Sequence, residues 1–178
     1  MFKQFNGKEI KDISAYVNGW LSDKDDCEIH IGTDSQVKNK HVVYVTVICL
    51  RQMGKGVHVI FERELLPINK KLVPFKSHDF KKAPGKRIKP KNEDLFMRLW
   101  GEIERTKTVA DIVSLHLLRN MHPKPVSIKV HLDINPDEKY GSNVAYQAGV
   151  GYFLGQDYDV FAKPDAWAAS CAADMLCK

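Results

Sequence analysis

Residues 29–36, IHIGTDSQ, form an apolar strand pattern that ends at an acid instead of a turn glycine. Taken alone, Asp34 fits a simple turn, because aspartate commonly hydrogen-bonds its own backbone where a strand ends. A second stretch, residues 126–133 (VSIKVHLD), alternates strictly between apolar and polar side chains and also ends at an acid, Asp133. This alternation predicts a strand with Asp133 on its polar face. The function of both acids therefore depends on how the two strands are arranged.

The other elements follow from periodicity and turn residues. Apolar residues at helical spacing predict an amphipathic helix over residues 8–22. The stretches HVVYVTVICL and VHVIFEREL predict two strands joined by the glycine-containing turn RQMGKG. Further predicted elements are a long helix from about residue 92 to 120, the strand at 126–133, a helix capped by Ser142 or Asn143 and ended by Gly155, the short strand DYDVFA, and a terminal helix opened by Pro164.

This order of elements predicts an α/β fold. After the first helix it reads β-β-β-α-β-α-β-α, which is typical of a mixed five-stranded sheet flanked by helices. Right-handed crossovers place the fourth strand beside the first, in the spatial order 3-2-1-4-5. The strands that carry Asp34 and Asp133 are then adjacent and parallel. Open α/β sheets bind ligands at the carboxyl ends of strands at such a topological switch.

Two carboxylates at neighbouring strand ends predict a cation site. Asp34 and Asp133 would repel each other strongly unless a positive charge lay between them. Hard oxygen ligands in an open site suit Mg²⁺ or Mn²⁺ and not zinc. The sequence therefore predicts a divalent-metal site at this edge of the sheet.

Composition indicates the class of protein. The chain has 178 residues, of which 44% are hydrophobic and 28% charged, as expected for one globular domain spanning residues 1–178. The N-terminus has no apolar signal-peptide core, and the longest apolar run is far shorter than the roughly 20 residues of a membrane helix. The four cysteines show neither a C-x-x-C pair nor zinc-ligand spacing, which favours reduced thiols. We expect a cytoplasmic protein with no membrane partner.

The positive charge is concentrated in one predicted loop. The whole chain carries +5, whereas residues 70–91 contain nine Lys or Arg against one acid and carry +8, which leaves the rest of the chain at −3. Phe75 and Phe80 lie among these cations. Basic residues interleaved with aromatic ones suit a nucleic acid, which offers phosphates and stackable bases. The alternative is a solvated loop whose lysines only aid solubility.

Three separated motifs resemble a known family. IGTDSQ, HLDINPDEKYGSN and KPDAWAASCAADML occur in an order similar to that of the ribonuclease H-like proteins of the YkuK family, over residues 28 to the end. The resemblance implies a ribonuclease H-like fold, two divalent metals and hydrolysis of phosphodiester bonds. It also implies four acids: one on the first strand, one on the helix after the third strand, one after the fourth strand and one on the terminal helix. Asp34 and Asp133 match the first and third.

The helical acid has several candidates in WGEIERTKTVAD. Glu104 and Asp111 lie seven residues apart on one stripe at the border of the apolar face, so we prefer Glu104 and hold Asp111 in reserve. Glu102 is predicted to project from the opposite border, where it can pair with Arg98 four residues earlier. All three acids could equally be solvated side chains paired with neighbouring cations.

The acid of the terminal helix has two candidates. Asp165 follows Pro164 directly after the last predicted strand, so we place Asp165 at the metal edge. Asp174 is the reserve candidate, among small alanines that let a helix pack closely. Lys163 could meet a phosphate, although an ordinary surface lysine is the simpler interpretation.

The leading functional expectation is a metal-dependent nuclease acting on RNA, DNA or a hybrid. In a two-metal mechanism one Mg²⁺ or Mn²⁺ activates a water and the other stabilises the leaving oxygen. Asp34 would bridge the two ions, Asp133 and Glu104 would hold one, and Asp165 the other. The main alternative is a ribonuclease H-like module that binds nucleic acid without cutting it. A third possibility, chemistry on a small phosphorylated metabolite, would leave the basic loop without a partner.

The basic loop generates a prediction of its own. Replacing Lys81, Lys82, Lys86 and Arg87 by Ala should weaken nucleic-acid binding and reduce the slope of log affinity against log salt by several units, because fewer counterions are released. Fluorescence anisotropy with a labelled oligonucleotide across a salt titration measures both quantities. An unchanged slope would exclude the loop from binding.

Overall fold

The computed structural model describes residues 1–39, 41–67, 91–119 and 126–178, with the backbone alone at 91–94. It contains one six-stranded mixed sheet in the order β1-β4-β3-β2-β5-β6. The strands are β1 (Lys3–Gln4), β2 (Cys27–Lys38), β3 (His41–Gln52), β4 (Gly56–Pro67), β5 (Ser127–Leu132) and β6 (Asp159–Ala162). The helical elements are α1 (Ile13–Leu21), α2 (Lys91–Arg119), η1 (Gly141–Ala145), α3 (Tyr146–Leu154), η2 (Ala168–Ala173) and α4 (Asp174–Cys177).

The α/β class and the arrangement of the five main strands agree with the sequence prediction. The predicted order 3-2-1-4-5 corresponds to β4-β3-β2-β5-β6, with β2 parallel to β5 and antiparallel to β3. The predicted count is one too low, because β1 adds to the edge at β4 through the pairs Lys3↔Phe61 and Gln4↔Ile60. A strand of two residues carries no periodic pattern from which it could be predicted.

The helices depart from the predicted bounds in three places. α1 begins at Ile13, where the side chain of Asp12 caps it by accepting a hydrogen bond from Ala15 N at 2.9 Å. The predicted helix after residue 142 begins as the 3₁₀ turn η1, and Ala145 precedes α3 without a side-chain cap. The terminal segment is a π-helical turn, η2, that continues into α4. The spacing of side chains does not predict whether a turn forms 3₁₀, α or π hydrogen bonds.

Unequal strand lengths create the feature on which the site depends. β2 does not end at Asp34, as the sequence suggested, but continues to Lys38 and pairs with β3 as far as Lys38↔His41. β5 has only six residues, and its last pair with β2 is Thr33↔Leu132. From Asp34 onward, the edge of β2 that would face β5 therefore has no neighbouring strand among the described residues.

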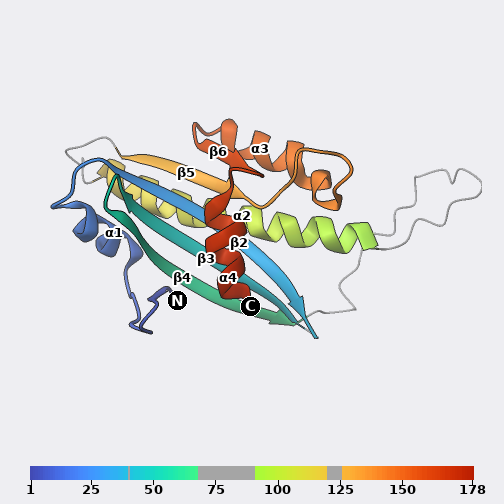
Figure 1. Ribbon diagram of the computed structural model, residues 1–178, viewed down its shortest axis with the longest axis horizontal. Coiled ribbons are helices and arrows are strands. Elements are labelled where there is room, and N and C mark those ends of the chain that lie inside the picture. Colours follow the sequence, from blue (N-terminus) through green and yellow to red (C-terminus); the bar gives the residue numbers. More distant parts are fainter. Residues whose placement is uncertain (40, 68–90, 120–125) are drawn as a thin grey trace, which may run out of the picture.

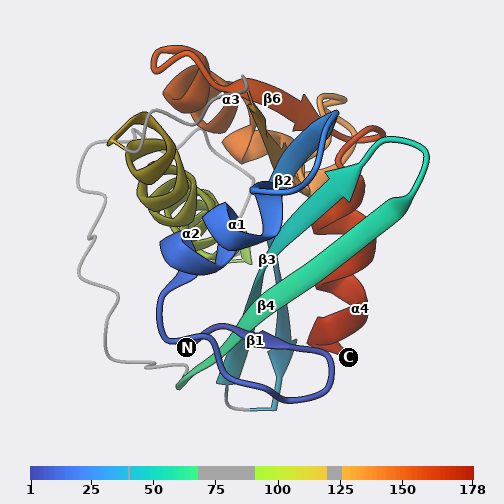
Figure 2. The same ribbon diagram turned by 90° about the vertical axis from the view of Figure 1, so that its left-hand side faces the viewer.

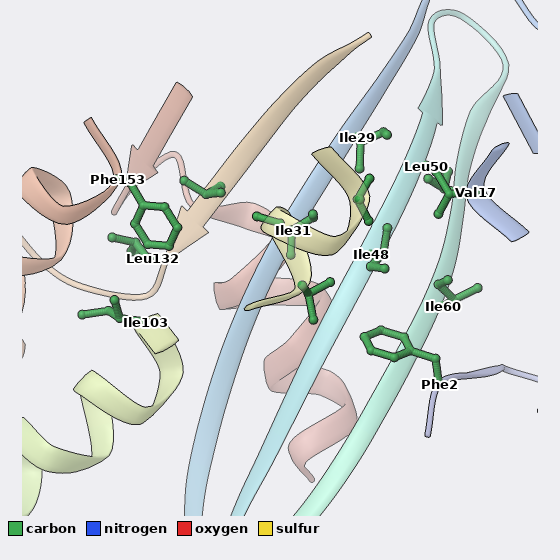
Figure 3. Close-up of a cluster of buried hydrophobic side chains, with 14 of the residues drawn as sticks. Phe2, Val17, Ile29, Ile31, Ile48, Leu50, Ile60, Ile103, Leu132 and Phe153 are labelled. Carbon is green, nitrogen blue, oxygen red and sulfur yellow. The ribbon is translucent and has the colours of Figure 1, made fainter. Parts of the chain in front are cut away.

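Helices cover both faces of the sheet. Figure 2 shows α1 and α2 on one side and α4 on the other, with α3 near β6. On the α2 face, Ile29 and Ile31 of β2 join Ile48 of β3 in the main core, which includes Ile103 of α2 (Figure 3). On the opposite face a smaller core forms from alternate residues of β3, one residue of β4 and small residues of the terminal helices: Val43, Val45, Val47, Cys49, Phe61, Ala168, Ala173 and Cys177. Within the described ranges, no helix is long and apolar enough to span a membrane.

The terminal helical segment lies very close to β2. A Cβ atom added to Gly32 would lie 2.9 Å from Ala169 N and 3.0 Å from Ala169 Cβ, so only glycine permits this approach. Ala168, Ala169 and Ala173 are fully buried at the contact. The approach sets how near α4 comes to the strand that carries Asp34 (Figure 1).

We predict that Gly32→Ala destabilises the fold by about 1–3 kcal/mol, because the added methyl meets backbone that cannot move freely. Gly151→Ala is the matched control, since a Cβ there meets nothing within 4 Å and alanine favours the helix by up to about 1 kcal/mol. Urea unfolding of the three proteins gives the comparison. Equal stability of wild type and Gly32→Ala would contradict the close approach.

Candidate functional site

A pocket of about 280 Å³ opens at the free edge of β2, beyond the last residue of β5. Its lining includes residues of α2 and of α4, which Figure 2 shows on opposite sides of the sheet. The residues that line it are Asp34, Ser35, Gln36, Leu95, Arg98, Leu99, Glu102, Asp133, Ser142, Lys163 and Asp174. Four carboxylates and two cations thus share one small space.

Each carboxylate reaches the pocket from a different element. Asp34 lies on β2 and Asp133 directly follows β5. Glu102 comes from α2 and Asp174 from the start of α4. Because β5 stops at Leu132, no strand of the described part of the chain lies beside Asp34, and acids from both faces can approach around the edge.

Glu102 is the most deeply buried of the four, with 3% of its surface exposed. Ser35 Oγ donates to its Oε1 at 2.5 Å, and Arg98 Nη1 donates to the same oxygen at 3.1 Å. Arg98 also donates to the carbonyl oxygen and to Oγ of Ser35, both at 2.6 Å, which fixes the guanidinium against the free strand edge. Burial raises the pKa of Glu102 to about 8, against the opposing effects of Ser35 and Arg98.

Asp34 is also buried, and no cation forms an ion pair with it among the residues that the structure describes. Burial raises its pKa to about 6, and the charges of Asp133 and Asp174 act in the same direction, whereas a backbone hydrogen bond from Ser35 opposes them. The mutual repulsion expected for Asp34 and Asp133 is therefore present, although burial is the larger effect.

Asp133 and Asp174 each form an ion pair with a lysine. Lys163 Nζ lies 2.9 Å from Asp133 Oδ1 and 3.0 Å from Oδ2, and the hydrogen-bond geometry is satisfied at Oδ2 only, which leaves Oδ1 buried without a hydrogen bond. Asp174 accepts a hydrogen bond from Gln36 Nε2 at 2.9 Å and pairs with Lys178 at 2.7 Å.

The donor set of the pocket is compatible with a hard divalent cation. Oxygen ligands from carboxylates are those that Mg²⁺ and Mn²⁺ prefer, and a buried carboxylate oxygen without a hydrogen bond, Asp133 Oδ1, is available as one. In their present positions, however, no three His, Cys, Asp or Glu side chains of the described segments form a group that could hold a metal. Glu102 is instead paired with Arg98, and Asp133 with Lys163. The chemistry of the donor set fits such a cation, and binding it would require these two carboxylates to exchange partners.

Three of the acids singled out from the sequence lie together in the pocket, and the others do not. Asp34 and Asp133 line the pocket together, and the reserve candidate Asp174 joins them. Glu104 and Asp165 do not line it: exposed Glu104 accepts a hydrogen bond from Trp100 Nε1 at 3.0 Å, and Asp165 is exposed at the turn after β6.

Asp111 is also remote from the pocket, where it accepts hydrogen bonds from Lys107 and from Tyr158 Oη. The basic-loop residues Lys81, Lys82, Lys86 and Arg87 lie outside the described residues.

Glu102 is the acid that the sequence analysis passed over. The predicted pairing with Arg98 is present, but it lies in the pocket and not on solvent-exposed helix surface. Gly101 gives the signal that would have identified this face: a Cβ there would lie 2.8 Å from Tyr44 Oη, so the helix approaches β3 closely at this point. A glycine inside a helical pattern often marks such a contact.

His131, on the same strand face as Asp133, belongs to a separate buried cluster. Its Nε2 lies 2.9 Å from Nδ1 of His30, whose Nε2 in turn lies 3.1 Å from Glu28 Oε2. Trp167 packs against both rings. Burial lowers the pKa of His131 to about 3, so the ring is neutral and packed in the interior.

The raised pKa values predict how stability depends on pH. A buried acid with a raised pKa binds its proton more tightly in the folded state, so its ionisation lowers the free energy of unfolding as pH rises. For Glu102 this loss should develop between about pH 4.5 and pH 8. The stability of Glu102→Gln relative to wild type should therefore increase across this window when both are measured in a metal chelator.

Glu104→Gln serves as the control for this measurement, because Glu104 is exposed two residues away on the same helix. Its stability relative to wild type should stay constant from pH 4.5 to 8 in urea unfolding. Parallel curves for Glu102→Gln and Glu104→Gln would contradict the burial of the Glu102 carboxylate.

The fold agrees with a comparison against protein families. The family model described as "Ribonuclease H-like" matches residues 9–73 and 84–178. No curated protein and no solved structure matches the chain. Since the family model covers most of the sequence, the chain belongs to the ribonuclease H-like family.

Proposed function

We propose that the chain is a divalent-metal-dependent nuclease that hydrolyses phosphodiester bonds, with its active site in the pocket at the free edge of β2. The observation that carries the proposal is the convergence of Asp34, Glu102, Asp133 and Asp174 from four separate elements. Four acids in one pocket are unfavourable without cations. Membership of the ribonuclease H-like family makes a nucleic-acid-related function the natural setting for such a pocket.

The four carboxylates would hold the metal, and Glu102 and Asp174 replace Glu104 and Asp165 as the proposed ligands. Bound Mg²⁺ or Mn²⁺ would supply an activated water and stabilise the leaving oxygen of the phosphodiester. Asp34 is the central candidate, because it lies between the acids of the two faces and lacks an ion-pair partner within the described parts of the chain. Arg98 would keep its place against the Ser35 carbonyl oxygen while the Glu102 carboxylate turned from Arg98 to the metal.

The substrate proposed is a nucleic acid, whether RNA, DNA or a hybrid. The basic stretch at residues 70–91 supplies the expected attraction for phosphates, since a pocket with four acids would otherwise repel a polyanion. Membership of the YkuK family, which rests on the three sequence motifs, and a cytoplasmic location, which rests on the N-terminal and cysteine patterns, belong to the same proposal.

A non-catalytic nucleic-acid-binding module is the second candidate. It is favoured by one observation: Glu102, Asp133 and Asp174 already have cationic partners within the chain. A protein of this kind would need no metal to keep the pocket stable. The two candidates therefore differ in their response to Mn²⁺.

Carboxylate variants test the proposal directly. Asp34→Asn and Glu102→Gln should each lower cleavage of a labelled oligonucleotide panel by at least about 100-fold, because a metal ligand is lost while the shape is kept. The same variants should lose most of the increase in melting temperature that Mn²⁺ gives the wild type.

Glu104→Gln is the control again, and it should cleave and respond to Mn²⁺ like the wild type. If Glu104→Gln were inactive and Glu102→Gln active, the sequence-based choice of ligand would be right and the pocket-based choice wrong. If Mn²⁺ changed neither the melting temperature nor the fate of any oligonucleotide, the non-catalytic module would be the better description.

A further inference from the structure

Lys163 occupies a defined position at the pocket. Its backbone N donates to the Ile134 carbonyl oxygen at 3.1 Å, which ties the residue after β6 to the segment after β5. The side chain is 37% exposed, yet its Nζ lies within 3.0 Å of both carboxylate oxygens of Asp133. The ammonium therefore lies where an approaching cation would meet Asp133.

The charges of the pocket are balanced by the chain itself at three of its four acids. Arg98 pairs with Glu102, Lys163 with Asp133 and Lys178 with Asp174. Arg98 also donates a hydrogen bond to the Ser35 carbonyl oxygen, which fixes its guanidinium. Lys178 is residue 178 and is exposed. Two cations line the pocket, and Lys163 is the one whose ammonium donates a hydrogen bond to Asp133 alone among the described residues.

We propose that Lys163 is a built-in counter-ion that competes with divalent metal for Asp133 and thereby sets the metal affinity of the site. A metal that binds Asp133 must displace the ammonium or share the carboxylate with it. Two cations on one carboxylate repel each other, so the lysine weakens metal binding and a bound metal weakens the ion pair. This inference rests on the proposed metal site.

A purely structural ion pair is the alternative, and a nearby pair allows the two to be separated. Lys139 and Asp137 form an ion pair in the loop that follows β5, and neither residue lines the pocket. A lysine that only stabilises this region would affect metal binding no more than Lys139 does. A lysine that competes with metal would affect it strongly and in a fixed direction.

Binding of Mn²⁺ to the full chain, followed by the electron paramagnetic resonance signal of free Mn²⁺, tests the proposal without any measurement of cleavage. Lys163→Met and Lys163→Gln should bind Mn²⁺ about tenfold more tightly than the wild type, the scale on which one neighbouring charge shifts an ionic equilibrium. Lys163→Arg keeps the charge and should bind Mn²⁺ no more tightly than the wild type. Lys139→Met should be unchanged, and Asp34→Asn identifies the Mn²⁺ that belongs to the pocket.

The outcomes separate this inference from the proposed function. Unchanged or weaker Mn²⁺ binding in folded Lys163→Met and Lys163→Gln would overturn the role of Lys163 and leave the metal site in place. Should both neutral variants fail to fold, tighter binding by Lys163→Arg would overturn it, and equal or weaker binding would support it. The absence of any Mn²⁺ binding that depends on Asp34 would overturn the metal site and this inference together.

Discussion

The early end of β5 is the constraint on which the pocket depends. Beyond the pair Thr33↔Leu132, β2 loses its neighbour on one side while its pairing with β3 continues for five more residues. Backbone groups on such an edge need partners from elsewhere. At this edge the Ser35 carbonyl oxygen accepts from Arg98. Cys177 Sγ donates to the carbonyl oxygen of the neighbouring Asp34 at 3.4 Å. Arg98 thus covers the free edge and holds α2 at the pocket, and Cys177 ties the terminal segment to the same stretch of β2.

Close packing at two glycines lets the helices approach from both faces. Gly32 admits Ala169 on one face, and Gly101 of α2 admits Tyr44 on the other. At Gly32 the backbone of the terminal segment lies against β2, and at Gly101 the backbone of α2 lies against the ring of Tyr44. Carboxylates held there are desolvated, which is the first cause of the raised pKa values of Asp34 and Glu102. The electrostatics of the pocket therefore follow from its packing.

The sequence predicted the parts of this arrangement that depend on strand periodicity. Asp34 and Asp133 could be placed together because alternation fixes which face a strand residue occupies, and crossover handedness makes the two strands neighbours. Periodicity alone could not show which acid of α2 faces the pocket. Glu102 and Glu104 differ by about 200° around a helix whose face toward the sheet is set by Gly101 and Arg98, and not by apolar spacing alone.

The terminal acid was harder to predict for a related reason. Asp165 follows β6 directly, but it lies in the turn before the helical segment begins. The π-helical turn η2 then carries the chain past Gly32, so that Asp174, and not Asp165, arrives beside Gln36. A π-helical turn depends on hydrogen-bond choices and close contacts that no residue spacing specifies. The predicted nucleic-acid-binding residues Lys81, Lys82, Lys86 and Arg87 lie outside the described residues.

The ion pairs of the pocket reconcile two requirements that appear opposed. A cluster of four acids lowers the stability of the folded chain unless cations reduce the repulsion, yet a binding site for an added cation needs carboxylates that can exchange partners. Arg98, fixed by three hydrogen bonds, meets the first requirement at Glu102. Lys163, half-exposed on a flexible stem and bonded to Asp133 alone within the described residues, can move away without breaking any other side-chain contact. Asp34 is then the carboxylate on which an added cation would act most strongly, because it is the one of the four acids without an ion-pair partner among the described residues.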